Sequence, residues 1–136
     1  GTTLKLQRKL QCIQNASARL ILDIPRHSHI TEHLRKLHWL PVNKRITVKL
    51  LIHTFKVLHN IGPEYLNQRV SFYTPSRQLR STHQALATVP RIKKATEGGR
   101  SFSHLAAKTW HTLQLHLRQV TSLPKFRKDL KTWLFD

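Results

Sequence analysis

The sequence predicts a mainly α-helical domain: a compact bundle of about six helices, interrupted near residues 71–100 by a basic insertion that is irregular or resembles a short β-hairpin. Apolar residues recur at helical spacing over several stretches that are separated by short links. Proline or glycine follows most of these stretches, at points where a helix has to end. The 136 residues are enough for a single domain with a buried core.

Residues 4–22 form the first predicted helix, which ends before Pro25. Its apolar residues recur three or four positions apart, so we expect them to form the buried face, with the Lys and Arg side chains outside. This apolar row consists of Leu6, Leu10, Ile13 and Leu20. Cys12 lies inside the same pattern, and we expect a buried, unreactive thiol.

The second and third predicted helices meet at a tight apolar corner, the segment 37–42, which we call the elbow. Thr31 is positioned to begin the second helix, and Pro41 is expected to stop it, because a residue before proline avoids the α region. Trp39 is the largest apolar side chain at this corner, and we expect it to be buried between the two helices. The third helix then runs from about Val42 to about residue 60.

Glycine and proline mark the end of this first half. Gly62 suits the left-handed position after the third helix, and Pro63 suits the start of a fourth helix that ends near Val70. Residues 71–100 have no helical period; the short apolar run 85–89 is interpreted as extended, and 91–100 as a basic loop or the return arm of a loose hairpin. Two further helices follow, one over 101–113 and one that Ser122 caps. The domain therefore divides into a four-helix part (1–70), the basic segment (71–100) and a C-terminal helical pair (101–136).

The charge balance points to an anionic partner. The chain carries 24 Lys and Arg against 6 Asp and Glu, a formal net charge of +18. Such an excess repels itself in a compact domain unless a partner neutralises it. Nucleic acid is the partner that this charge favours, while an anionic membrane or an acidic protein surface are the alternatives. The expected nucleic-acid-binding residues are Arg35, Lys36, Lys44, Arg45 and Lys49 around the elbow, Arg77, Arg80, Arg91, Lys93, Lys94 and Arg100 in the middle segment, and Lys125, Arg127, Lys128 and Lys131 in the last helix.

Nothing in the sequence points to catalysis, a metal or a cofactor. The six acidic residues are scattered, whereas a two-metal site needs carboxylates that converge on the cations. Ten histidines are present, but no spacing completes a zinc ligand set, and one cysteine excludes a thiolate-rich site. We therefore predict a domain that is not an enzyme. Tyr73 is a candidate for stacking on bases, whereas Trp39, Trp110 and Trp133 continue apolar rows and are expected in the core.

The sequence also bears on where the chain works. No apolar run approaches the length that a membrane-spanning helix needs, and the N-terminal residues lack the apolar core of a signal peptide. The chain begins inside a helical pattern without a methionine, as a piece of a longer protein would. We expect an intracellular setting, in the nucleus, the cytoplasm or both, with no membrane contact.

Beyond these patterns, a specific succession of motifs runs through nearly the whole chain. Its most specific parts are Leu37-His-Trp-Leu-Pro-Val42 and Tyr73-Thr-Pro-Ser-Arg77. Around them stand Leu6-Gln-Arg-Lys-Leu-Gln-Cys-Ile-Gln-Asn-Ala-Ser-Ala-Arg-Leu20, Lys44-Arg-Ile46, Pro63-x-Tyr-Leu66, Leu79-Arg-Ser81, Val89-Pro-Arg91 and Ala106-Ala-Lys-x-Trp110. This order resembles the C-terminal region of LINE-type (non-LTR) retrotransposon reverse transcriptases of the vertebrate and jockey-like lineages.

The resemblance implies a segment that follows the polymerase domain in a protein that nicks DNA and copies its own RNA at the nick. The family's Tyr/Phe-x-Asp-Asp polymerase motif, its endonuclease domain and the Cys/His knuckle of some members have no counterpart here. A non-catalytic part is therefore implied, one that contacts the rest of the reverse transcriptase and helps to hold template RNA or target DNA. The alternative is a protein-interaction or scaffold domain, including a host-adopted fragment of such an element.

Overall fold

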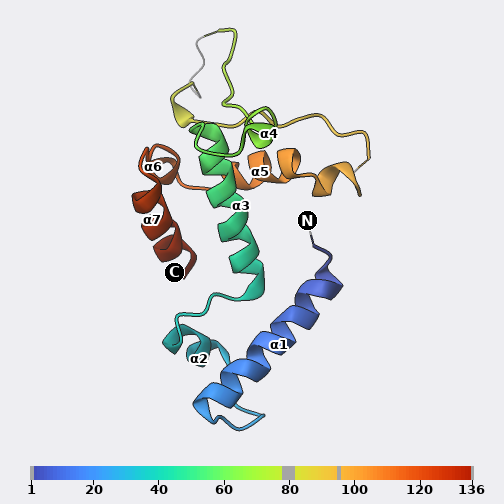
Figure 1. Ribbon diagram of the computed structural model, residues 1–136, viewed down its shortest axis with the longest axis vertical. Helices are drawn as coiled ribbons and strands as arrows, with labels where there is room; N and C mark the ends of the chain where they lie inside the picture. Colours follow the sequence, from blue (N-terminus) through green and yellow to red (C-terminus); the bar gives the residue numbers. More distant parts are fainter. Residues whose placement is uncertain (1, 78–81, 95, 136) are drawn as a thin grey trace.

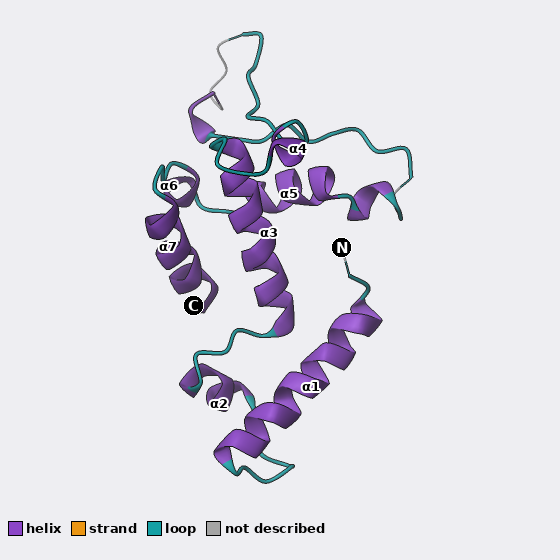
Figure 2. Cartoon of the chain, in the orientation of Figure 1, coloured by secondary structure: helices purple, strands orange, loops and turns teal. Residues whose placement is uncertain are grey.

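The computed structural model describes residues 2–77, 82–94 and 96–135. Within these ranges the fold is mainly α, with helices α1 (Leu4–Leu22), α2 (Thr31–Lys36), α3 (Val42–Leu58), α4 (Glu64–Asn67), α5 (Phe102–His111), α6 (Leu115–Arg118) and α7 (Leu123–Phe135) (Figures 1 and 2). Two short 3-10 turns, Thr82–Gln84 and Gly98–Arg100, lie in the irregular segment. The predicted helical bundle is confirmed; the one-turn helix α6 was not predicted.

Helix α3 is the centre of the molecule. Helices α5 and α7 pack against it, while α1 and α2 form an arm at its N-terminal end (Figure 1). Phe55 on α3 stacks on Phe126 of α7 with ring centroids 4.5 Å apart, and Trp110 of α5 approaches Phe126 at 5.8 Å. All three side chains are fully buried. The core therefore joins the first part of the chain to the last, across the irregular segment.

The elbow is shaped by a left-handed residue rather than by proline. His38 has a φ of 53°, and the N–H of Trp39 donates to the Leu34 carbonyl at 2.8 Å while the N–H of His38 donates to Arg35 at 2.9 Å. These two bonds are the Schellman arrangement that ends many helices. Helix α2 thus ends at Lys36, earlier than the expected stop at Pro41, which instead immediately precedes α3.

Helix α3 also ends with a residue in the left-handed region, but this is not the residue that the sequence predicts. Asn60, with a φ of 56°, takes the left-handed position that we assigned to Gly62, and the N–H of Ile61 donates to Lys56 at 2.8 Å. Gly62 lies in a tight place instead. A Cβ there would lie 3.1 Å from Asn67 Oδ1 and 3.3 Å from Val57 Cγ2, so these two side chains would have to shift by a few tenths of an ångström to accept it.

The described residues of the segment 71–100 are irregular, as predicted, and α5 contacts the part around Ala85 and Ala87. An antiparallel bridge joins Phe72 to Ala87, the only β pairing among the described residues. The Trp110 indole N–H donates to the Ala85 carbonyl at 2.8 Å, and His111 Nε2 lies 2.9 Å from the Ala87 carbonyl. The extended run near Ala87 therefore pairs with the chain before it, whereas the expected return arm contains the 3-10 turn at Gly98–Arg100.

Helix α1 contradicts the expectation about its buried face. Leu6, Leu10, Ile13 and Leu20 are 40–85% exposed, and Cys12 is exposed too. The buried side chains of α1 are Gln14 and Ala18. The cause lies at the elbow, where the helix docks through hydrogen bonds rather than through its apolar row.

Two amides of α1 hold the backbone on either side of Pro41. Gln14 Nε2 donates to the Leu40 carbonyl at 2.9 Å, and the Val42 N–H donates to Gln11 Oε1 at 2.8 Å. Pro41 has no N–H, and Val42 begins a helix whose first N–H groups lack helical partners. The amides satisfy these backbone groups, and this polar docking turns the apolar row outward.

Candidate nucleic-acid interface

The elbow positions cations on both of its sides. Arg35 and Lys36 are exposed on the last turn of α2, while Arg45 and Lys49 are exposed on the first turns of α3. Lys44 is half-buried, and its Nζ donates to the Leu134 carbonyl at the end of α7. The predicted elbow group is thus brought together, and Lys44 ties it to the C-terminal helix.

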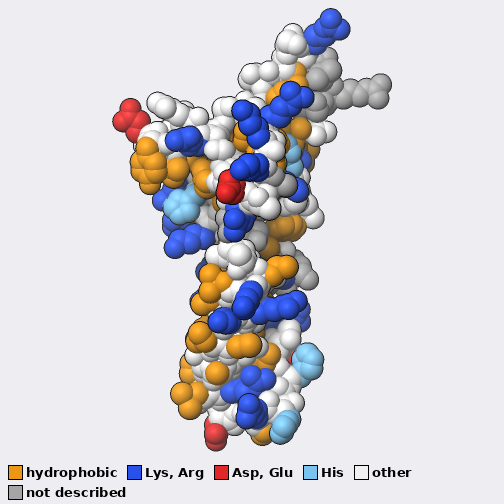
Figure 3. Space-filling model, turned by 90° about the vertical axis from the view of Figure 1, so that its right-hand side faces the viewer, with side chains coloured by type: hydrophobic (Ala, Val, Ile, Leu, Met, Phe, Trp, Pro, Cys, Tyr) orange, Lys and Arg blue, Asp and Glu red, His pale blue; other side chains and the backbone are white. Residues whose placement is uncertain are grey.

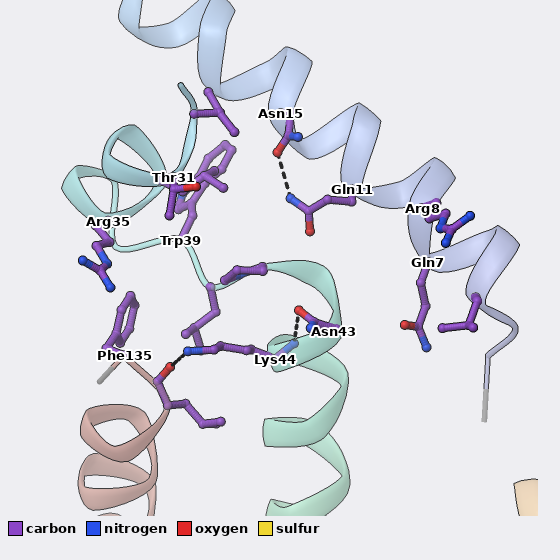
Figure 4. A pocket seen from close by; sticks show the side chains of 16 residues that line it. Gln7, Arg8, Gln11, Asn15, Thr31, Arg35, Trp39, Asn43, Lys44 and Phe135 are labelled. Atoms are coloured by element: carbon purple, nitrogen blue, oxygen red, sulfur yellow. Dashed lines mark hydrogen bonds between the residues drawn. The ribbon is translucent and has the colours of Figure 1, made fainter. Parts of the chain in front are cut away.

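Two hollows flank the elbow, and each is lined by two of these cations, whereas Lys36 lines neither. One, which we call the elbow cavity, has a volume of about 530 Å³ and lies between α1, α2, the start of α3 and the end of α7. Figure 4 shows Arg8 and Gln7 on one side of it, Arg35 and Phe135 on the opposite side, and Lys44 with Asn43 toward α3. The second hollow lies between α1 and α3 and includes Arg45 and Lys49.

Trp39 lies between the two hollows, and its exposure contradicts our prediction that it is buried. The indole lines both of them and is only half-buried, so it is not the core residue that the sequence suggested. Trp110 is fully buried, and Trp133 is half-buried against the core. Tyr73, the expected base-stacking residue, is 46% exposed beside the irregular segment.

The middle group of cations lies away from the elbow, toward the other end of α3. Arg77, Arg91, Lys93 and Lys94 are exposed, whereas Arg80 lies outside the described residues. Arg100 donates through Nε to the Thr96 carbonyl at 2.7 Å within its own turn. Figure 3 shows Lys and Arg side chains spread along one whole face, with hydrophobic side chains among them in the α1 arm.

Helix α7 supplies the third group. Its cations Lys125, Arg127, Lys128 and Lys131 are all exposed, whereas Phe126, Leu130 and Leu134 are buried. The end of α7 reaches the elbow through Leu134 and Phe135, which line the elbow cavity. The structure therefore connects the elbow and α7 groups and leaves the middle group at a distance.

Sequence reasoning missed the contribution of α1 to the elbow cavity. Arg8, Gln7, Gln11 and Asn15 all line it, and the amides at 7, 11 and 15 follow one another at the four-residue spacing that places side chains on one helix face. This row of amides is the sequence signal that could have predicted the contribution of α1 to the cavity. The apolar row beside it instead suggested which face of the helix is buried.

One further cation points inward. Burial lowers the pKa of the Arg118 guanidinium from its ordinary value, and its Nε and Nη1 atoms are buried without a hydrogen-bond partner. The structure gives no account of why an arginine stands there.

The described residues contain no group of three or more His, Cys, Asp or Glu side chains that could hold a metal ion. Within the same ranges, no helix is long and apolar enough to cross a membrane. The described site offers exposed cations, side-chain amides and an aromatic surface. No protein-family model matches the chain, and neither the curated proteins nor the solved structures contain a significant match.

Proposed function

We propose that this chain is a non-catalytic, basic helical domain that binds nucleic acid, template RNA or target DNA, as the C-terminal part of a LINE-type reverse transcriptase. The observation that carries the proposal is that many cations are exposed and lack ion pairs. Arg35, Lys36, Arg45, Lys49, Arg91, Lys93 and Lys94 are exposed and make no ion pair with any carboxylate that the structure describes. Their field is therefore free to act on phosphates.

The charge also has to be neutralised. With a net charge of +18 on 136 residues, self-repulsion opposes the compact fold, and a bound polyanion relieves it. A nucleic-acid backbone presents a regular series of phosphates, which matches cations that are spread over the elbow, the middle segment and α7. Family membership rests on the sequence resemblance, which runs through the elbow motif and the Tyr-Thr-Pro-Ser-Arg motif.

The test is a comparison of variants at low salt. Replacing Arg91, Lys93 and Lys94 together by Gln should weaken binding to a short RNA and to a short DNA duplex, measured by fluorescence anisotropy. The matched control replaces Lys5, Lys9 and Arg26, which are exposed and outside the predicted groups. Melting temperatures should stay close to wild type in both. Equal affinities for the two triple variants would contradict the assignment of the middle group, and absence of any binding by the wild type would refute the function.

A second candidate function is protein interaction, and one observation favours it: the exposed apolar row of α1. Leu6, Leu10, Ile13 and Leu20 are uncovered along a helix that also carries exposed cations. In a reverse transcriptase this row would contact the rest of the chain. A pull-down with nuclease treatment tests this function. Proteins that stay bound to the domain after the treatment, together with no measurable binding of nucleic acid, would favour the scaffold function.

A further inference from the structure

The elbow cavity combines three kinds of group that few ligands satisfy together. Its walls carry the cations Arg8, Arg35 and Lys44, the amides Gln7, Gln11, Asn15 and Asn43, and the aromatic rings of Trp39 and Phe135 (Figure 4). Among the described residues, no Asp or Glu lines it. Its volume of about 530 Å³ lies within the roughly 300–1,000 Å³ typical of small-molecule sites.

The cationic side chains that line this cavity use few of their hydrogen-bond donors within the protein. The guanidinium groups of Arg8 and Arg35 make no hydrogen bond or ion pair with any described residue. Lys44 gives one donor to the Leu134 carbonyl, and an ammonium group has three. The N-terminal end of α3, where Asn43 lies, adds the positive end of a 17-residue helix. The cavity is therefore prepared for an anion.

The aromatic part of the wall favours a ligand that has a flat ring as well as an anionic group. Trp39 presents a half-buried indole, and its N–H donates to no described residue. Stacking on such a ring is how proteins hold single bases of an unpaired strand. The neighbouring amides are only partly used: Gln11 Nε2 donates to Asn15 Oδ1 at 2.8 Å, whereas the Asn15 amide nitrogen donates to no described residue.

We propose that the elbow cavity takes one unstacked nucleotide of a single strand, with its base against Trp39, one flanking phosphate toward Arg35 and Lys44, and the other flanking phosphate toward Arg8 on the opposite side. This inference rests on the proposed nucleic-acid binding and names the unit that is recognised. A free nucleotide shares the same chemistry, but α2 and α7, which both line the cavity, carry further exposed cations that favour a continuous strand.

The test compares strands of equal length and charge with and without bases. Oligoadenylate RNA should bind about tenfold more tightly than an abasic strand, as one stacked base provides. Arg8→Gln and Arg35→Gln should each weaken oligoadenylate binding severalfold more than Lys9→Gln, which changes the same charge on an exposed position of α1 outside this cavity. Trp39→Leu should abolish the preference for bases while abasic binding is retained; a melting curve checks its fold.

Several results would overturn the inference. Equal affinity for the two strands, or equal effects of Arg8→Gln and Lys9→Gln, would leave nucleic-acid binding intact but remove the nucleotide site. Adenosine monophosphate binding more tightly than oligoadenylate would show that the occupant is not a strand. Failure of the wild type to bind either strand at low salt would refute the proposed function itself, together with this site.

Discussion

Two tryptophans with the same apolar context in the sequence have different roles in the structure. Trp110 is fully buried, its N–H donates to the Ala85 carbonyl at 2.8 Å, and its ring packs near Phe126. Trp39 is half-buried and lines two hollows. Residue type identifies a candidate for the core, but exposure depends on what the neighbouring helix places over the ring.

The stability of two alanine variants should reflect this difference. Trp110→Ala removes a fully packed side chain and should cost about 3–5 kcal/mol in the free energy of unfolding. Trp39→Ala should cost roughly half of that or less, because a half-exposed ring gives up less buried area. Urea denaturation measures both. Equal losses would show that the elbow belongs to the core, as the sequence first suggested.

His59 gives the fold a dependence on pH. Its ring lies against Phe55 with centroids 4.2 Å apart, and its Nε2 atom is buried without a partner. Burial lowers the pKa of His59 below its ordinary value of 6.5. The folded state therefore favours the neutral ring, and the unfolded state takes up the proton at higher pH.

Acidification should destabilise the fold through His59. Stability from the neutral ring is fully present above pH 6.5 and is lost as the pH falls from there through the lowered pKa. The melting temperature should thus decrease on acidification in this window. His59→Phe keeps the ring contact and should reduce the decrease, whereas the exposed His27→Phe should not. An unchanged pH profile in His59→Phe would show that other groups cause the dependence.

At the scale of elements, the orientation of α1 is the main departure from the sequence analysis. The apolar row marks one side of the helix correctly, yet a periodic pattern does not show which side meets the rest of the fold. Gln11 and Gln14 decide it, because they satisfy backbone groups beside Pro41 that would otherwise be unpaired. The result is a helix that is docked by amides and exposed along its leucines.

Cys12 reports on this orientation. It lies on the exposed part of α1, so a maleimide should label it in the native protein nearly as fast as in a denatured sample. A thiol buried in the core would react only when the domain opens. Protection of Cys12 under native conditions, with rapid labelling in denaturant, would mean that the face of α1 that carries Cys12 is covered.

Much of the remaining architecture could be predicted from the sequence. The first and third helices begin and end within about two residues of their predicted limits, because apolar periodicity and the following proline are strong local signals. The helix ends at His38 and Asn60 were not predicted, since left-handed positions are usually assigned to glycine. The elbow cavity could not be predicted either, because α1, α2, α3 and α7 form it together.

At the scale of the whole molecule, the distribution of charge carries the functional account. The described members of the predicted cation groups lie on three parts of the molecule, and Lys44 links the elbow to the end of α7 through the Leu134 carbonyl. The third part lies toward the opposite end of α3. A ligand that contacts all three has to be long and polyanionic, which a nucleic acid is and a small anion is not.

The central claim is tested most directly by the salt dependence of binding. Each phosphate contact releases counterions, so the logarithm of the affinity should fall linearly with the logarithm of the salt concentration, by about 0.9 per contact on duplex DNA. With about five contacts we expect a slope of about −4 or steeper for a duplex, and a somewhat shallower one for single-stranded RNA. Anisotropy titrations over a salt series measure these slopes. Undetectable binding at low salt, or an affinity that does not change with salt, would contradict the account.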